Sequence, residues 1–144
     1  MSRKGRAALR LGMVSGLTVL IGLGLYVRYA PTDPERWHRM PENVESHDLE
    51  HGAIRVEPGD EEDLRRLHRI ILDTARTRVV AGSVEDGMIT YVTRSAVFRF
   101  PDYTTVRHRD TRIEIFGRLR FGQSDIGVNA ARIDRWLQAL SDGR

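Results

Sequence analysis

The pattern of apolar and polar positions divides the chain into one long apolar run and a region of mixed periodicity. Residues 11–27 contain no charged side chain, and these seventeen residues would rise about 25 Å as a helix, close to the ~30 Å hydrocarbon core of a membrane. Arg10 and Arg28 flank the run, and their long side chains can extend toward the two interfaces. The pattern therefore predicts that residues 1–30 form a basic tail and a transmembrane helix.

The rest of the chain shows helical spacing on either side of a block of strands. Apolar residues recur every three or four positions over 60–77, after a capping-box pattern at Asp60 and Asp63, and again over 128–141. Turn residues between these segments separate four runs of strand-forming residues. The predicted fold class is α+β: an N-terminal transmembrane helix followed by a small domain with a four-stranded antiparallel meander and two helices on one face. The predicted strands cover residues 78–83, 88–99, 103–108 and 112–121.

The predicted lead-in to this domain, residues 31–59, is acidic and contains several prolines, so we expect it to be irregular. A short helical turn at Pro34 is the exception, with Asp33 as its cap and Trp37 packed on the domain. The domain proper is expected to span 60–141. In its last strand, apolar and polar residues alternate, which predicts one buried face and one solvent-exposed face. The residues predicted to be solvent-exposed are Arg112, Glu114, Phe116, Arg118 and Arg120.

Charge is segregated along the chain. The first 30 residues hold five basic residues and no acidic one, whereas the remainder holds 18 arginines and 20 acidic residues. The excess basic charge therefore belongs to the predicted anchor, and the composition gives no support for nucleic-acid binding. Basic residues before an apolar span favour a cytoplasmic N-terminus, so we expect a single-pass protein of the bacterial inner membrane with a periplasmic domain. The chain has no cysteine, which excludes disulfides and thiol chemistry.

The apolar run has two further interpretations. A cleaved signal peptide would need small residues three positions and one position before the cut, and before Pro31 these positions hold Arg28 and Ala30, which favours a retained anchor. Gly12 and Gly16 have the GxxxG spacing of a helix-pairing face, although glycine is common in apolar spans by chance.

Charge is also uneven within the domain. Residues 33–63 contain eleven acidic residues and three arginines, whereas residues 64–144 contain fifteen arginines and nine acidic residues. Two interpretations remain open. The acidic segment covers and neutralises the basic half, or a basic face stays exposed and meets an anionic ligand or a lipid surface.

Residues 117–140 read GRLRFGQSDIGVNAARIDRWLQAL and contain the pattern Gly-x-Ser-Asp-x-Gly-x-Asn-x-x-Arg-Ile. This pattern resembles the C-terminal signature of a bacterial and plastid family, domain of unknown function 1499. Residues 78–110 resemble the central strands of that family. The matching signature residues are Gly122, Ser124, Asp125, Gly127, Asn129, Arg132 and Ile133.

A further motif of the chain, Trp37-His38, resembles the N-terminal Trp-His motif of the same family. Met40 stands where the family usually has an acidic residue, which weakens any role for His38. The resemblance covers about residues 33–140. It implies no established activity, and it fits the predicted anchor, because N-terminal anchors or targeting signals before this domain are common.

The signature loop is the best candidate site in the sequence. Backbone N–H groups at a helix start bind anions, and guanidinium groups bind phosphate or carboxylate. We hypothesise that the loop and the neighbouring arginines bind an anionic ligand. The structural alternative is that Asp125 pairs with an arginine and the loop locks strand to helix. The candidate ligand-binding residues are Arg118, Arg120, Ser124, Asp125, Asn129 and Arg132.

Three functions are compatible with these features. The first is a non-enzymatic envelope protein whose domain binds a lipid headgroup, a glycan phosphate or a protein on the outer face of the inner membrane. The second is an enzyme acting on an envelope substrate, with Asp125 or a histidine as acid/base. The third is a scaffold subunit of a membrane complex.

No catalytic, metal or cofactor motif is recognised in the sequence, so no cofactor is expected. His47 and His51 have i, i+4 spacing, which suits either a metal clip or a solvated surface. Phe98, Phe100 and Tyr103 cluster at one predicted hairpin end, where they either belong to the core or enter the membrane interface beside the anchor.

Overall fold

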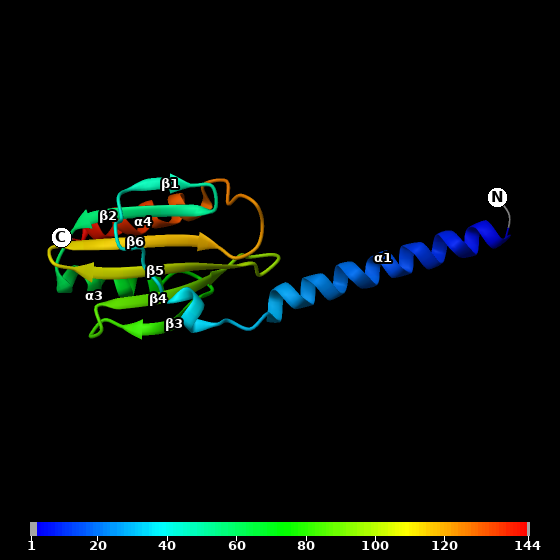
Figure 1. Cartoon of the computed structure of the whole chain (residues 1–144), viewed down its shortest axis with the longest axis horizontal. Coiled ribbons are helices and arrows are strands. Elements are labelled where there is room, and N and C mark those ends of the chain that lie inside the picture. Colours follow the sequence, from blue (N-terminus) through cyan, green and yellow to red (C-terminus); the bar gives the residue numbers. More distant parts are fainter. Residues whose placement is uncertain (1–2, 144) are drawn as a thin grey trace. The chain divides into compact units, whose positions relative to one another are not determined.

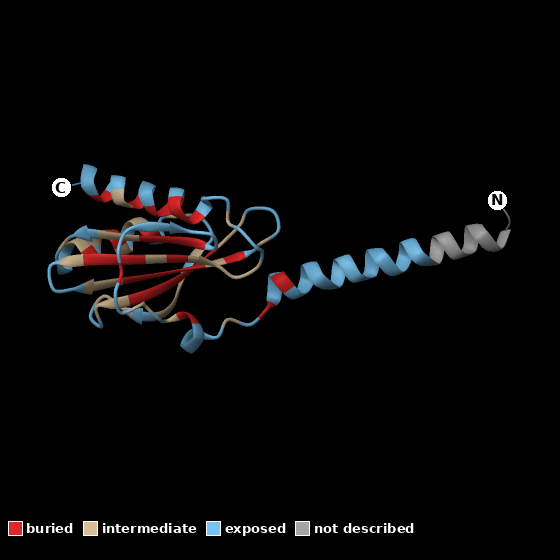
Figure 2. Ribbon diagram, turned by 45° about the horizontal axis from the view of Figure 1, so that its top comes forward, coloured by how far each residue is buried: buried red, intermediate tan, exposed pale blue. Residues whose placement is uncertain are grey.

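The computed structural model describes the backbone of residues 3–143 and the side chains of residues 12–143. The chain forms two compact units, which meet in the sequence between Pro31 and Thr32. The first unit contains one helix, α1 (Arg3–Tyr29). Its segment Gly12–Tyr29 is long and apolar enough to cross a membrane, a property that a signal sequence near an N-terminus shares. Most of this segment is exposed, as the colour of the ribbon shows (Figure 2), and its exposed residues include Leu17, Leu20, Leu23 and Leu25.

The second unit contains a six-stranded antiparallel sheet in the order β1-β2-β6-β5-β4-β3 (Figure 1). The predicted α+β class, the apolar N-terminal helix and the antiparallel sheet are confirmed, but the prediction of four strands was wrong. The predicted meander corresponds to β3 through β6, and two more strands precede it. The elements are α2 (Pro34–Trp37), β1 (His47–Leu49), β2 (Gly52–Pro58), α3 (Glu61–Leu72), β3 (Thr77–Ser83), β4 (Met88–Arg94), β5 (Pro101–Arg109), β6 (Arg112–Leu119) and α4 (Val128–Asp142).

The two additional strands lie in the segment 31–59, which was expected to be irregular apart from one helical turn. β2 pairs with β6 along its whole length, from Gly52 opposite Arg118 to Pro58 opposite Arg112. Without β2, the edge of β6 would carry unpaired backbone N–H and C=O groups. Because its pairing partner lies far away in the sequence, β2 could not be recognised from the acidic, proline-flanked composition of its own segment.

Several element boundaries also differ from the predicted ones. The segment after β4 turns away from the sheet, because Ser95 donates its N–H to the carbonyl of Phe100 and Phe100 donates its N–H to Ser95 Oγ, both at 3.0 Å. These two bonds close a loop where a continuous strand was predicted. In the structure α3 ends at Leu72 rather than at residue 77, β4 ends at Arg94 rather than at 99, β5 begins at Pro101 where a turn was predicted, and β6 ends at Leu119 rather than at 121.

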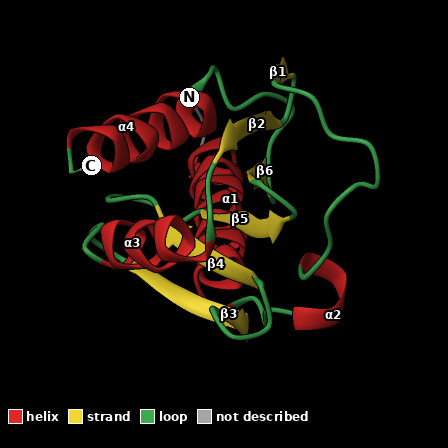
Figure 3. Cartoon of the chain, turned by 90° about the vertical axis from the view of Figure 1, so that its left-hand side faces the viewer, coloured by secondary structure: helices red, strands yellow, loops and turns green. Residues whose placement is uncertain are grey.

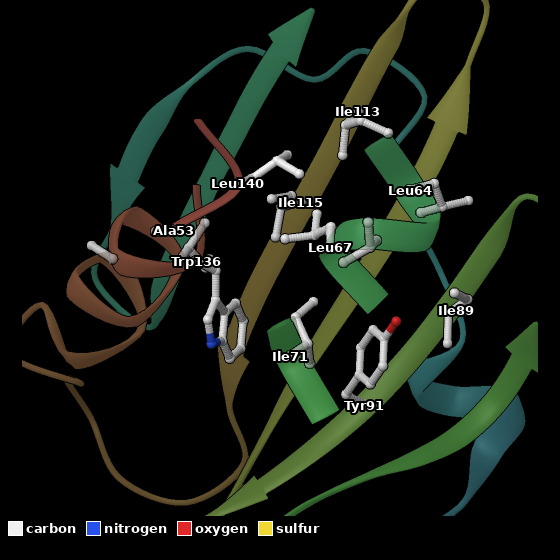
Figure 4. Close-up of a cluster of buried hydrophobic side chains, with 13 residues drawn as sticks. Ala53, Leu64, Leu67, Ile71, Ile89, Tyr91, Ile113, Ile115, Trp136 and Leu140 are labelled. Atoms are coloured by element: carbon white, nitrogen blue, oxygen red, sulfur yellow. The ribbon is translucent and has the colours of Figure 1, made fainter. Parts of the chain in front are cut away.

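Helices α3 and α4 cover one face of the sheet and form the main core with it (Figures 3 and 4). The helix α3 begins with the predicted capping box, in which Asp63 N–H donates to Asp60 Oδ1 and Asp60 N–H donates to Asp63 Oδ2. Every residue of the buried clusters belongs to the second unit, which therefore has a core of its own. The main core contains Leu64, Leu67 and Ile71 of α3, Ile133, Trp136 and Leu140 of α4, and Ile89, Tyr91, Val106, Ile113 and Ile115 of the sheet.

The opposite face of the sheet is covered by residues 37–46, which we call the strap. Trp37 begins it and stacks on Tyr103, with ring centroids 4.0 Å apart and an interplanar angle of 11°. Further along, the carbonyls of Pro41 and Glu42 accept hydrogen bonds from Arg107 and Arg109, at 3.1 and 3.3 Å. The prediction that Trp37 packs on the domain is confirmed. Figure 3 shows α2 on the side of the sheet opposite α3 and α4.

The strap overturns the prediction that one face of the last strand is solvent-exposed. Glu114, which was assigned to that face, is 0% exposed, and its Oε2 accepts a 2.6 Å hydrogen bond from Arg107 Nε. Arg118 is also covered, because Trp37 lies above it. The alternation in the sequence separates two faces correctly, but it carries no information on which distant segment covers the second face.

Candidate functional site

The signature loop holds its own backbone in place through Asp125. Asp125 Oδ1 accepts from the N–H of Gly127, and Oδ2 accepts from the N–H of Asn129, each at 3.0 Å. Gly127 adopts a left-handed conformation with φ of 75°, which glycine accepts without steric cost. Ser124 Oγ accepts from the N–H of Ile126 at 3.2 Å. The Asp125 carboxylate therefore binds the backbone at the start of α4, and among the described residues it forms no ion pair with an arginine, which the structural alternative had expected.

Arg132 is buried beneath this loop. Its Nη1 donates to Asn129 Oδ1 at 2.9 Å and its Nη2 donates to Asp102 Oδ2 at 3.0 Å. The second bond joins α4 to the start of β5. Burial raises the pKa of the Asp102 carboxyl, while the positive charge of Arg132 opposes that shift. The arginine of the signature is thus paired with a carboxylate inside the protein, and it locks the helix to the sheet.

Arg118 lies on the other side of the sheet from Arg132. Its Nη2 donates to the carbonyl of Trp37 and to Thr105 Oγ1, both at 2.7 Å, and its guanidinium lies 4.3 Å from the ring centroid of Phe116. Burial lowers the pKa of Arg118 to about 10. The structure therefore does not bring Arg118 together with the loop residues Ser124, Asp125, Asn129 and Arg132.

Arg120, at the end of the same strand, belongs to a different group of arginines. Its Nη1 donates to the hydroxyl of Tyr103 at 3.2 Å. Nearby, Arg94 Nη1 donates to the carbonyl of Arg99 at 3.0 Å. Burial lowers the pKa of Arg94, Tyr103 opposes that shift, and the positive charges of Arg78, Arg120 and Arg99 lower the pKa further. We call these four residues, Arg78, Arg94, Arg99 and Arg120, the arginine cluster.

The arginine cluster lies at the end of the sheet where β5 begins and β4 and β6 end. Only Arg120 was a predicted site residue. The sequence did hold a signal for Arg78 and Arg94. The turn around Gly87 joins β3 and β4 in a hairpin in which Arg78 lies opposite Val92, two residues before Arg94. The two arginines therefore share one face of the sheet, at the end of the hairpin away from the turn. Arg99 stands in a loop, and nothing in its local sequence indicates the group.

Exposed apolar side chains surround the same end of the sheet. The exposed fractions are 78% for Val97, 69% for Phe98, 40% for Phe100 and 91% for Ile126. Phe100 also lies 6.5 Å from Phe121 between ring centroids, which links the loop before β5 to the loop after β6. Of the predicted aromatic cluster, Tyr103 is fully buried whereas Phe98 and Phe100 are exposed.

The histidines do not gather at one place. His68 Nδ1 lies 2.8 Å from the Tyr91 hydroxyl, at a shallow groove of about 430 Å³ between α3 and the β3–β4 turn, and burial raises the pKa of Tyr91. His47 and His51 lie exposed at the β1–β2 hairpin. Among the residues whose side chains are described, no three histidine or acidic residues are grouped to hold a metal ion.

Fold and site together define a class of protein: an α+β domain whose sheet lies between two helices and a strap, with arginines and exposed apolar side chains at one end, preceded by one helix apolar enough to cross a membrane. The profile of the family described as "Protein of unknown function (DUF1499)" matches residues 27–140 of the 144 in the chain, and the chain belongs to this family. The match confirms the resemblance carried by the signature loop. No curated protein matches the chain as a relative.

Proposed function

We propose that the protein is a single-pass membrane protein whose folded domain, Thr32–Arg144, binds an anionic group through the arginine cluster. The observation that carries this proposal is the presence of four arginines at one end of the sheet, where Arg94 donates to the carbonyl of Arg99, Arg120 donates to the Tyr103 hydroxyl, and Arg78 lies opposite Val92 on the neighbouring strand. Like charges held close together repel, and a bound anion would relieve that repulsion. A guanidinium offers paired N–H donors that suit phosphate or carboxylate oxygens.

The anchor in this proposal is α1. Its apolar segment follows a basic stretch without acidic residues, which favours a cytoplasmic N-terminus. In a bacterium, this orientation places the domain on the periplasmic face of the inner membrane. Phosphate-bearing lipid headgroups, glycan phosphates and acidic protein segments are all present there as anionic partners.

The polar groups of the signature loop are used inside the protein rather than for a ligand or a reaction. Both Asp125 oxygens accept backbone hydrogen bonds, and Arg132 is neutralised by Asp102. Such an arrangement fixes the loop to the helix and the sheet. The proposed ligand site therefore keeps Arg120 from the sequence hypothesis and replaces the remaining candidates with Arg78, Arg94 and Arg99.

The proposal predicts that a soluble anion stabilises the full chain in neutral detergent. Inorganic pyrophosphate at about ten times its dissociation constant should raise the unfolding midpoint by about 5 °C, measured by thermal denaturation at constant ionic strength. The double variant Arg78→Gln/Arg99→Gln should lose most of this shift, since two of the four cationic groups are gone.

A matched double variant provides the control. Arg69→Gln/Arg135→Gln removes the same charge from exposed positions on α3 and α4 and should keep the pyrophosphate shift. Equal shifts in the two double variants would mean that stabilisation by pyrophosphate depends on the net charge of the protein, and the arginine cluster would then not be the binding site.

A further inference from the structure

We infer that the end of the domain bearing the arginine cluster docks on the surface of an anionic lipid bilayer, with Val97, Phe98 and Ile126 entering the interface. This inference rests on the proposed function and names its partner: the surface of the membrane that α1 crosses. We call Val97, Phe98 and Ile126 the apolar tip.

The apolar tip comes from two loops at one end of the sheet (Figure 1). β5 and β6 are antiparallel neighbours with Asp102 opposite Leu119, so the loop before β5 and the loop after β6 leave the sheet at the same place. The contact between Phe100 and Phe121 joins these loops directly. Residues from both can therefore meet one flat surface together.

The conformation of Ile126 indicates that the apolar tip contacts a binding partner and does not stabilise the fold. Ile126 is 91% exposed, so its side chain adds almost nothing to the core. Its φ is 51°, a left-handed conformation that β-branched residues rarely adopt. Folding alone would favour asparagine or glycine here. An apolar side chain kept exposed in an unfavourable conformation indicates a surface that is covered in the functional state.

The charges next to Val97 and Phe98 favour an anionic bilayer among apolar partners. Arg99 stands between Phe98 and Phe100 in the sequence, and the Arg120 guanidinium lies 5.0 Å from the ring centroid of Phe121. Phenylalanine side chains enter the boundary between headgroups and acyl chains of a membrane, and adjacent arginines are attracted to anionic lipids. A free phosphate would account for the arginines but not for the apolar tip.

The covalent connection limits how far this end of the domain can lie from the last residue of α1. Thr32 Oγ1 lies 2.9 Å from the Tyr103 hydroxyl, which also accepts the bond from Arg120. Only Ala30 and Pro31 separate Thr32 from the last residue of α1, and three extended steps span about 10 Å. A bilayer that holds α1 is therefore present at high effective concentration for docking.

The absence of cysteine from the sequence allows a clean test with single introduced thiols. Val97→Cys reports on the tip, and Glu85→Cys reports on the β3–β4 turn at the opposite end of the sheet. Each full-length variant carries an environment-sensitive NBD label in lipid nanodiscs, made of phosphatidylcholine alone or mixed with phosphatidylglycerol, with and without spin-labelled lipid. In anionic nanodiscs the Val97 probe should shift to the blue and lose most of its fluorescence to the spin label, whereas the Glu85 probe should do neither.

A second variant separates docking from folding. Ile126→Gly relieves the left-handed strain and removes the apolar side chain, so it should weaken quenching of the Val97 probe while leaving the unfolding midpoint equal or higher. Reduced quenching together with a lower midpoint would contradict this assignment of Ile126.

The outcomes also distinguish this inference from the proposed function. A Val97 probe that stays in water in anionic nanodiscs, while pyrophosphate still stabilises the chain, would overturn bilayer docking and leave anion binding in place. If the Val97 probe stays in water and pyrophosphate does not stabilise the chain, both bilayer docking and anion binding by the arginine cluster would be overturned. Shielding of the probe that depends on protein concentration but not on lipid charge would assign the tip to a second copy of the chain instead.

Discussion

Replacing Glu114 with alanine is expected to lower the free energy of unfolding by about 3 kcal/mol, because it leaves a largely buried arginine without its counter-charge. Glu114 is 0% exposed, and Arg107, only 21% exposed, holds its Oε2 with Nε at 2.6 Å and Nη2 at 2.5 Å. Arg112 Nη2 adds a charge 3.0 Å from the other oxygen. Urea denaturation of the chain in neutral detergent, followed by tryptophan fluorescence, measures the loss, since both tryptophans lie in the domain.

Two variants identify the cause of that loss. Arg112→Ala removes the more exposed partner, which is 41% exposed, and should cost less than about 1 kcal/mol. The double variant Glu114→Ala/Arg107→Ala should be more stable than Glu114→Ala alone, because the more buried of the two arginines left without a partner is then gone. If the double variant is the less stable of the two, burial of an unpaired arginine is not the source of the effect.

The elements that could be predicted from the sequence are those whose signals are local. The helix α3 carries its capping box and its apolar spacing within one short segment, and β3 through β6 are separated by turn residues. The strand β2 was missed because it is defined by pairing with β6, about 60 residues later in the sequence. Pairing between distant segments leaves no periodic signal in either one alone.

A related reason explains why the structure does not bring Arg118 and Arg120 together with the loop residues of the candidate site, although one clue was available. Gly117 was placed on the buried face of the last strand, and its neighbour Arg118 on the other. Because α4 packs on the Gly117 side, a Cβ there would lie 2.9 Å from Ile133 Cδ1, so Arg118 could not also face α4. Alternation could thus have separated Arg118 from Arg132. The pairing of Arg132 with Asp102, thirty positions earlier in the sequence, could not be read from the sequence.

The strap gives Trp37 an importance that the sequence alone only suggested. Its ring stacks on Tyr103 and joins a second buried cluster with Val92, while the Arg118 guanidinium lies 5.4 Å from its centroid. Its carbonyl accepts from both Arg118 and Thr105. Trp37 and His38 are therefore the point where the strap is attached to the sheet, and the Trp37 side chain shields a charged, hydrogen-bonded layer from water.

Replacing Trp37 with alanine is accordingly expected to cost about 4 kcal/mol of unfolding free energy, the range for a large aromatic removed from a packed site. Urea denaturation followed by the fluorescence of the remaining Trp136 measures this, and Trp37→Phe, which keeps a ring on Tyr103, should lose less than half as much. Hydrogen exchange adds a second test: the Thr105 and Arg107 amides under the strap should exchange faster in the alanine variant, whereas those of Leu67 and Ile71 in the core of α3 should change no more than global stability requires. An alanine variant that loses under 1 kcal/mol would mean that the strap is held by its backbone bonds to Arg107, Arg109 and Arg118 alone, and that Trp37 does not anchor it.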